Sequence, residues 1–463
     1  MRRTFALATP LLAGLMLAGC GSLVPPMQAP RAELPESFRP AGTSSAPQSA
    51  SHEWDGFFSD SRLRQVVGLA LADNRSLRAS LAAVDRFRAQ YRVTQAASSP
   101  EVRATANTGI QGTNGNSVAG LSVNLGFTAW EVDLFNRLGS LEGAALSRFE
   151  GQQETQRSAR LSLVAEVANA WLTLAAERQR QQLAEELRNS QQSTLTLTDR
   201  QYQLGAVSGL QRARAQTAFQ AARGEVARTA AVAAQARLAL ELLAGQALPN
   251  SLLPGGQIDA ATTTPLPDLP GGLPATVLLQ RPDLRAAEQA LKAAAFDVGA
   301  ARAARFPRLT LTASAGQRST ELAGLFDSGS TVWSLLPTLD LALFDAGNRA
   351  AQVQANEATQ RQVLAQYEAA LQSAFREVAD ALAVRDSLAE RLAAQQAQVQ
   401  AAERSLNLVE QGFRLGGSSQ LELLDAQRQL SAAQQGLVTL RLVEQSNRVA
   451  LLRALGGRWT AGS

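Results

Sequence analysis

The feature that most constrains this chain is an internal duplication. Residues 74–100 align without a gap with residues 281–307, and further matches follow downstream. Those matches pair residues 166–170 with 377–381 and residues 202–205 with 413–416. A repeat of this length is too long for an ordinary solenoid and indicates a duplicated, domain-sized unit. Each copy is predicted to form a helix, two strands, a very long helix, a glycine turn and a second helix.

The duplication also limits the number of domains that we expect, and the charge pattern limits the class of partner. A chain of 463 residues would ordinarily suggest about three domains, but two copies of one plan predict one structural unit. The 44 basic and 40 acidic residues give a formal charge of +4, and the basic residues are scattered among Glu, Gln and Ala. This pattern is typical of solvated helix faces, and no nucleic-acid partner is expected because aromatic and basic residues do not cluster.

The N-terminus resembles a bacterial lipoprotein signal peptide. A short basic start precedes an apolar stretch, residues 5–18, that is too short to span a bilayer, and small residues lead up to Cys20. Cys20 is the only cysteine, and we interpret it as the lipid-attachment site and first residue of the mature chain. In such lipoproteins Gly21, rather than Asp, favours the outer membrane. The alternative is an ordinary secretory signal followed by a coincidental cysteine.

Proline marks where long helices can form. Residues 101–248 and 338–463 contain none of the 17 prolines. Because an interior proline costs about 3 kcal/mol in a helix, these tracts permit uninterrupted helices. We place these helices at about 138–204 and about 346–414, which at 1.5 Å per residue makes each roughly 100 Å long. Nothing of that length forms the core of a compact domain.

Apolar residues within both tracts recur at spacings of three and four, which predicts coiled-coil-like packing. They are Leu161, Val164, Ala168, Trp171 and Ala175 in the first copy and Leu364, Tyr367, Leu371, Ala374 and Val378 in the second. Helical periodicity alone leaves open a solvent-exposed coiled-coil rod.

Four short stretches argue against the rod because they alternate between apolar and polar residues. The clear ones are residues 121–129 and 309–316, and the weaker ones are residues 102–110 and 335–343. A period of two predicts strands, each close to the length of a tilted transmembrane strand. Pro337 is expected at a bulge or an unpaired position. The polar segments 112–116 and 321–330 are expected to form the hairpin turns.

Four strands cannot close a barrel in lipid, where open strand edges are not tolerated. Oligomerisation is therefore required. Two chains would give eight strands around a lumen filled by side chains, whereas three would give twelve and leave an opening. The small polar residues on the strands favour the open form.

These features divide the chain into six segments. They are a signal peptide at 1–19, a lipidated tether at 20–58, the first repeat at 59–245, an equatorial inter-repeat linker at 246–273, the second repeat at 274–456 and a C-terminal tail at 457–463. The tether and the linker are rich in proline and carry no helical pattern. His52, the sole histidine, lies in the tether and is interpreted as a surface residue.

The order of four motifs makes the chain resemble the TolC-like outer-membrane efflux factors, especially the lipoprotein branch that serves RND-type multidrug pumps. The motifs are RPDLRAAE at 281–288, WEVDLF at 130–135, LFDAG at 343–347 and LLDAQ at 423–427. The resemblance covers nearly the whole mature chain. It implies a mainly α fold with transmembrane β, in which a homotrimer contributes four strands per chain to a 12-stranded β-barrel joined to a long periplasmic α-helical barrel.

The resemblance also implies a function and partners. Such proteins lie in the outer membrane, extend into the periplasm and act as passive exit ducts for drugs or other small molecules. An inner-membrane RND-type transporter and a periplasmic adaptor supply the cargo in a tripartite pump. The sequence has no phosphate-binding loop, nucleophile elbow or His/Cys metal motif, so we expect neither enzymatic activity nor a cofactor or metal. The alternative is a lipid-anchored periplasmic coiled-coil scaffold without a pore.

The turns at 204–208 and 415–419 occupy equivalent ends of the two long helices. In the resembled family, such turns form the periplasmic tip that meets the adaptor. The candidate docking residues are Gly205, Ser208, Gly416 and Ser419. Helix C-capping suits the two glycines equally well.

Two acidic residues just after the second turn are the candidate periplasmic gate. Glu422 and Asp425 are three residues apart and would share a helix face, and in the family acidic side chains at these positions point into the narrowed periplasmic end. A trimer would gather three copies of each carboxylate, with Arg414 and Arg212 as the nearest candidates to offset their repulsion. Gln211 replaces an acidic partner found in some relatives. An ordinary solvated helix face is the alternative.

Overall fold

The computed structural model describes residues 23–26, 54–113, 116–256 and 275–457. They divide into two compact units. The strand unit comprises residues 23–26, 82–154 and 283–370, and the helical unit comprises residues 54–81, 155–256, 275–282 and 371–457. Cys20, His52 and most of the predicted linker lie outside the described residues.

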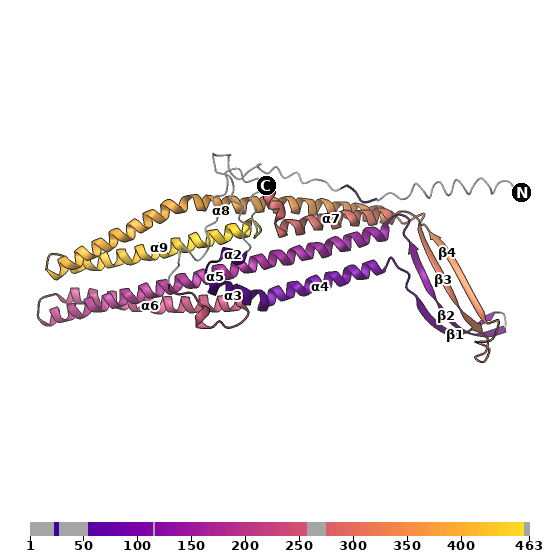
Figure 1. Cartoon of the computed structure of the whole chain (residues 1–463), viewed down its shortest axis with the longest axis horizontal. Helices are drawn as coiled ribbons and strands as arrows, with labels where there is room; N and C mark the ends of the chain where they lie inside the picture. Colours follow the sequence, from indigo (N-terminus) through magenta and orange to yellow (C-terminus); the bar gives the residue numbers. More distant parts are fainter. Residues whose placement is uncertain (1–22, 27–53, 114–115, 257–274, 458–463) are drawn as a thin grey trace. The chain divides into compact units, whose positions relative to one another are not determined.

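The predicted element order occurs twice (Figure 1). The first copy contains α4 (Arg75–Ala96), β1 (Arg103–Thr113), β2 (Asn116–Val132), α5 (Arg137–Gln203) and α6 (Gly209–Ala244). The second contains α7 (Pro282–Ala303), β3 (Arg308–Ser319), β4 (Thr331–Asp340), α8 (Asn348–Arg414) and α9 (Gln420–Ala454). The short elements are α2 (Trp54–Phe57), α3 (Ser61–Asp73), η1 (Asn250–Leu252) and η2 (Ala275–Gln280). Helices α5 and α8 each contain 67 residues, and their bounds confirm the predicted long helices.

The four strands form one antiparallel sheet in the order β1-β2-β3-β4, so the two copies meet at the β2–β3 pair. Glycines permit that pairing: a β-carbon on Gly126 or Gly316 would lie 2.1 Å from a carbonyl oxygen of the facing strand. A bulge interrupts the register between Phe127 and Trp130, where Ala129 has a positive φ of 52°.

Two details of the predicted strands were wrong. Pro337 lies neither at a bulge nor outside the pairing, because it is aligned with Leu311 in an unbroken β3–β4 register. Since β4 is the edge of the described sheet, its outer side can lack an N–H donor without breaking the ladder. Strand β4 also begins and ends earlier than the predicted 335–343, because its ends are set by pairing from Thr331 to Asp340.

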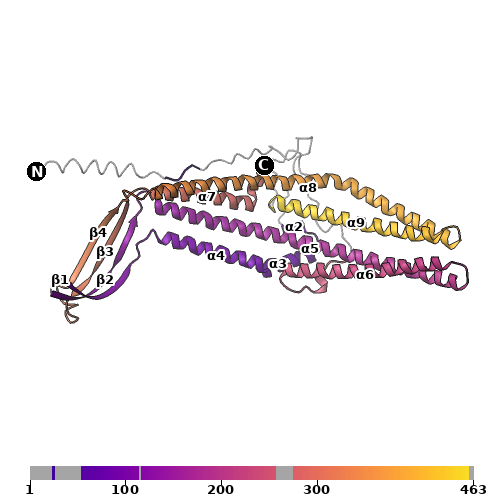
Figure 2. The same ribbon diagram turned by 180° about the vertical axis from the view of Figure 1, so that it is seen from behind.

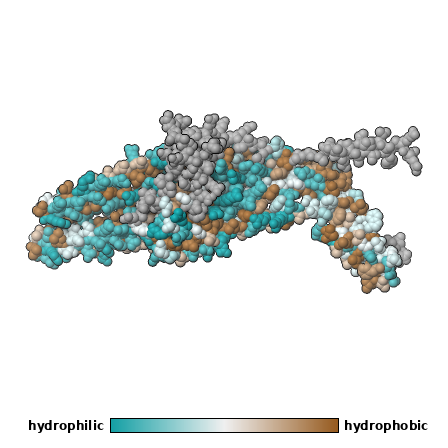
Figure 3. Space-filling view, in the orientation of Figure 1, coloured by the Kyte–Doolittle hydropathy of each residue, from teal (hydrophilic) through white to brown (hydrophobic). Residues whose placement is uncertain are grey.

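The strands expose many large apolar side chains. Every residue of β4 is exposed, and the brown colouring in Figure 3 marks apolar residues on these strands. The exposed apolar side chains of β4 are Val332, Trp333, Leu335, Leu336 and Leu339. No helix among the described residues is both long and apolar enough to cross a membrane.

The helical unit has a continuous apolar core. Val164, Ala168 and Trp171 of α5 are buried there, which confirms the predicted apolar spacing in the first copy. They pack with α3 and with the ends of α6 and α9, elements that lie close together in both ribbon views (Figures 1 and 2). The remaining core residues include Phe57, Phe58, Leu63, Val66, Leu172, Leu240 and Val449.

In the helical unit, each copy has an equivalent hydrogen bond that joins the start of its first helix to the end of its last. Asn74, just before α4, donates from Nδ2 to the carbonyl of Leu243 near the end of α6 at 2.9 Å. Arg281, just before α7, donates from Nη1 to the carbonyl of Ala454 at the end of α9 at 3.0 Å. Arg281 is 6% exposed and also pairs with Glu377 of α8 at 2.9 Å. The duplication therefore preserves a contact while changing its chemistry.

Candidate functional site

The turn between α5 and α6 is built by one glycine and one serine. Gly205 follows the end of α5 with a positive φ of 73°, and the Ala206 N–H donates to the Gln201 carbonyl at 2.8 Å. This is the hydrogen bond of a Schellman C-cap. Ser208 then caps α6: Gln211 N–H donates to Ser208 Oγ at 3.3 Å, and Ser208 N–H donates to Gln211 Oε1 at 2.8 Å.

The turn between α8 and α9 repeats this geometry. Gly416 has a φ of 79°, and the Gly417 N–H donates to the Gly412 carbonyl at 2.7 Å. Ser419 caps α9, with Glu422 in the position that Gln211 occupies in the first copy. The Ser419 N–H donates to Glu422 Oε2 at 2.6 Å. All four candidate docking residues therefore define the turns and the helix starts that follow them.

Both turns also present leucines that the chain does not bury. Leu204 and Leu415, one residue before each turn glycine, are 83% and 88% exposed. Leu210 and Leu421, at the starts of α6 and α9, are exposed as well. A pair of exposed leucines at equivalent positions of both turns is a surface available to a partner.

Glu422 and Asp425 share one face of α9, as predicted, and the opposite face packs against α5. Leu423 and Leu424 are buried, whereas Glu422 is exposed. Buried Gln420 donates to Thr198 Oγ1 of α5 at 3.3 Å. The two carboxylates are therefore on the side of α9 that α5 does not cover.

Within one chain, Asp425 and Arg212 have other partners. Asp425 pairs with Arg428 of its own helix at 2.7 Å, and Arg212 pairs with Asp199 of α5 at 2.7 Å. Arg414 is exposed. The Glu422 carboxylate serves the capping box, and the donation by the Ser419 backbone N–H holds its pKa below the usual value. Neither predicted arginine therefore offsets the acidic pair within one chain.

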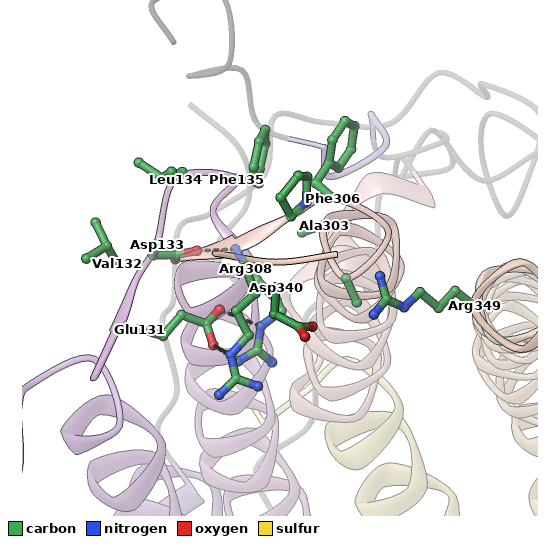
Figure 4. Close-up of a pocket in the computed structure, with 13 residues that line it drawn as sticks. Glu131, Val132, Asp133, Leu134, Phe135, Ala303, Phe306, Arg308, Asp340 and Arg349 are labelled. Atoms are coloured by element: carbon green, nitrogen blue, oxygen red, sulfur yellow. Dashed lines mark hydrogen bonds and ion pairs between the residues drawn. The ribbon is translucent and has the colours of Figure 1, made fainter. Parts of the chain in front are cut away.

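A second charged centre, which the sequence patterns did not predict, joins strands to helices in the strand unit. Glu131, near the end of β2, has a side chain only 10% exposed and accepts hydrogen bonds from Arg137 Nε at 2.8 Å and Nη2 at 2.7 Å. Arg308, at the start of β3, pairs with the same carboxylate at 2.9 Å. Figure 4 shows how Glu131, Asp133 and Arg308 gather at the strand ends.

The helix starts beside this centre are capped by aspartates at equivalent places. Asp133 accepts from the N–H groups of Arg137 and Gly139 of α5 at 2.6 and 2.8 Å. Asp345 accepts from the N–H groups of Gly347, just before α8, and of Arg349, in the first turn of α8, at 3.0 and 3.1 Å, and these bonds lower the pKa of Asp345. A cavity of about 220 Å³ has Glu131, Asp133, Arg308 and Arg349 among its lining residues. Asp133 lies in the motif WEVDLF and Asp345 lies in the motif LFDAG. Their equivalent places in the two copies were the signal in the sequence for this junction.

The family comparison covers most of the chain. The family model described as "Outer membrane efflux protein" matches residues 66–246 and 273–457. The chain is 37% identical over 470 residues to the antibiotic efflux pump outer membrane protein ArpC of Pseudomonas putida, covering 98% of this chain and 96% of that protein. It is 34% identical over 456 residues to the cation efflux system protein CusC of Escherichia coli, covering 97% and 98%.

A solved structure shows the same fold. The open-state MtrE outer membrane channel of Neisseria gonorrhoeae superposes with a TM-score of 0.86 at 33% identity, covering 94% of this chain and 98% of that chain. The chain therefore belongs to the outer membrane efflux protein family, with the TolC-like channel fold and the role as an outer-membrane efflux component that its sequence predicts.

Proposed function

We propose that three copies of this chain form a passive exit duct that works with a periplasmic adaptor and an inner-membrane RND-type transporter. The observation that carries the trimer is the described sheet, which ends at β1 and β4 with both outer edges open. Open edges are not tolerated in lipid, so neighbouring copies must cover them. Twelve strands leave a lumen, whereas eight fill theirs with side chains.

Conductance tests this duct against the scaffold without a pore. The purified protein is reconstituted in planar bilayers, and its mass is measured in detergent by native mass spectrometry. We expect a trimer that shows single-channel conductance. Conductance is also measured in a variant in which the turns at 204–208 and 415–419 are loosened. A monomer that never conducts would instead support the lipid-anchored coiled-coil scaffold.

The two turns are proposed to dock the adaptor. Their exposed leucines, Leu204 and Leu415, support this role because the described chain leaves both uncovered. Leu204→Ser with Leu415→Ser should lower drug resistance and adaptor co-purification without changing trimer mass or outer-membrane location. Leu242→Ser, an exposed leucine of α6 away from both turns, is the matched control. Wild-type resistance and co-purification in the double variant would count against docking at the turns.

Bulky replacements of the turn serines test the same proposal by obstruction. Ser208→Tyr with Ser419→Tyr should abolish efflux. Since these changes also remove two helix caps, the variant is informative only together with its trimer mass and its location. Unchanged drug resistance would contradict the docking role of the serines.

Glu422 and Asp425 are proposed to gate the periplasmic end of the duct. Their shared face supports this role: Glu422 is exposed and Asp425 half-exposed, and a trimer would bring three copies together so that the carboxylates would repel one another. Glu422→Gln with Asp425→Asn should weaken block of the pore by divalent cations and reduce its cation preference. Arg376→Gln with Asp380→Asn, an exposed pair of α8, is the control. Unaltered block and selectivity in the gate variant would remove these residues from the mechanism.

Cys20 is proposed to carry the lipid. Its support is the signal-like sequence before it and its position as the only cysteine. Metabolic labelling with palmitate should mark the wild-type protein and not Cys20→Ser. Equal labelling of both would place the acyl chains elsewhere.

A further inference from the structure

Helices α5 and α7 of the strand unit contact a short, half-buried piece of the N-terminal chain at Ser140, Gly299 and Arg302, a contact surface that we call the cleft. A β-carbon built on Gly299 of α7 would lie 2.6 Å from Val24 Cγ2 and 3.1 Å from Val24 Cα. The same position is 3.2 Å from Ser140 Oγ of α5. The carbonyl of the preceding residue, Leu23, accepts a hydrogen bond from Arg302 Nη1 of α7 at 3.5 Å. Side chain and backbone of this segment are therefore both in contact with the helices.

The cleft is closely fitted to this segment. Gly299 and Ser140 are buried, and any side chain on Gly299 would occupy the space of Val24. Arg302 is oriented by Glu357 of α8, whose Oε1 accepts from Arg302 Nη2 at 2.8 Å. This ion pair leaves Nη1 facing the Leu23 carbonyl. The helices thus provide a close contact for Val24 at Gly299 and a positioned donor for the backbone.

The other copy of the repeat lacks these features. In the alignment of residues 74–100 with 281–307, Arg92 of α4 corresponds to Gly299 and Gln95 corresponds to Arg302. Arg92 is exposed, and Gln95 donates to Glu142 of α5 at 3.0 Å. If Gly299 served only the packing of α7 on α5, a small residue would be expected at Arg92 too. The difference points to a role that only the second copy performs.

We propose that this cleft is a docking site for residues 23–26 of the same chain, and that it holds the lipidated Cys20 beside the membrane strands. The proposal rests on the proposed lipidation. Two residues separate Cys20 from Leu23, so their α-carbons are within roughly 11 Å at most. Ser140 lies shortly after β2 and Gly299 shortly before β3, so the acyl chains would enter the leaflet next to these strands. The cleft thus fixes where on the channel its lipid anchor attaches.

Disulfide trapping in outer membranes tests the docking directly. In the full chain carrying Val24→Cys and Ser140→Cys, the two positions are close enough for a disulfide, since Val24 Cα and Ser140 Oγ lie 3.1 and 3.2 Å from one point beside Gly299. We expect an intramolecular cross-link, identified by mass spectrometry of the joined peptides and missing from each single variant. Ser314→Cys with Ser334→Cys, opposite each other on β3 and β4, is the positive control. A cross-link in the control and none between positions 24 and 140 would overturn the proposal.

A second set of variants tests what holds the segment. In a Val24→Cys and Ser140→Cys background, Gly299→Val should slow cross-linking at least tenfold, whereas Gly224→Val, where a β-carbon meets open space, should not. Arg302→Gln leaves the packing of α7 intact. It should slow cross-linking about three times as much as Glu357→Gln does. Wild-type cross-linking rates in both Gly299→Val and Arg302→Gln would refute the docking role.

Palmitate labelling of the same samples separates the two proposals. A labelled protein that does not cross-link would mean that the anchor exists and the docking site is wrong. A cross-linked protein without label would mean that residues 23–26 dock but that Cys20 carries no lipid, which overturns the anchoring role of the cleft.

Discussion

Replacing Glu131 by glutamine removes one charge from the strand–helix junction while preserving the size of the side chain. Its carboxylate accepts two hydrogen bonds from Arg137 and pairs with Arg308. Hydrogen bonds to charged groups contribute roughly 1.5–3 kcal/mol each. Arg308 is 53% exposed, so its share is that of a surface ion pair, about 0–1 kcal/mol. Glutamine keeps one acceptor oxygen but turns an amide N–H₂ toward a guanidinium. We therefore expect a loss of about 2 kcal/mol in the free energy of unfolding.

Guanidinium-induced unfolding in detergent, followed by circular dichroism, measures this loss. The midpoint should fall while the slope with denaturant is unchanged, since the surface exposed on unfolding is the same. Arg376→Gln breaks an exposed ion pair, 83% and 68% exposed, and should leave the midpoint unchanged. Because Arg137 provides most of the interaction, adding Arg308→Gln to Glu131→Gln should cost under about 1 kcal/mol more. The reasoning fails if Glu131→Gln is as stable as Arg376→Gln, or if Arg308→Gln alone reproduces the whole loss.

Three further predictions concern features that occur in both copies. Ser208→Ala and Ser419→Ala should each destabilise the following helix start by about 1 kcal/mol, seen as faster amide exchange there, and unequal effects would contradict the equivalence of the two caps. Because the pKa of Glu422 is lowered in the folded protein, its stabilising effect is complete above the unfolded-state pKa of about 4.3 and is lost at lower pH. Glu422→Gln should abolish this acid dependence of the unfolding midpoint, whereas Gln211→Ala should not. Arg281→Ala should destabilise the protein by about 2–3 kcal/mol and Asn74→Ala by about 1–2 kcal/mol in denaturant unfolding, since Arg281→Ala removes an ion pair as well as a hydrogen bond and leaves Glu377 only the longer pair with Arg453 at 3.9 Å.

The sequence predicted elements well where a local rule determines them, and less well where pairing does. Helix α5 ends just before Gly205, which has a positive φ. Helix α8 begins only after Ala346 and Gly347, both of which have positive φ. In contrast, the alternating pattern placed Ala129 on the face of Leu121 and Phe127. Because of the bulge, Trp130 lies on that face instead of Ala129. Phe127 is aligned with Ala313, and Trp130 is aligned with Leu311, two residues away on β3. The alternating pattern of one strand does not locate a bulge in its pairing with the neighbouring strand.

The site residues follow the same division. The turn glycines and serines could be identified because capping requires particular residues at fixed spacings. The partners of Asp425 and Arg212 could not, because many charged side chains lie within reach along a helical surface and geometry selects among them. The Glu131 centre was missed for a further reason: Glu131, Arg137 and Arg308 come from three elements and converge only when the strands pair.

Comparison of the two copies separates structural requirements from functional ones. Both copies keep a left-handed glycine, a capping serine and a capping aspartate, because every helix end must satisfy its free N–H and carbonyl groups. They differ at Gly299 against Arg92 and at Glu422 against Gln211, where either residue type is compatible with the helix. At these positions helix formation does not decide the residue, so the difference reflects what surrounds it. The second copy accordingly bears both the docking cleft and the charged face of the proposed gate, and the first copy provides the matched control for each.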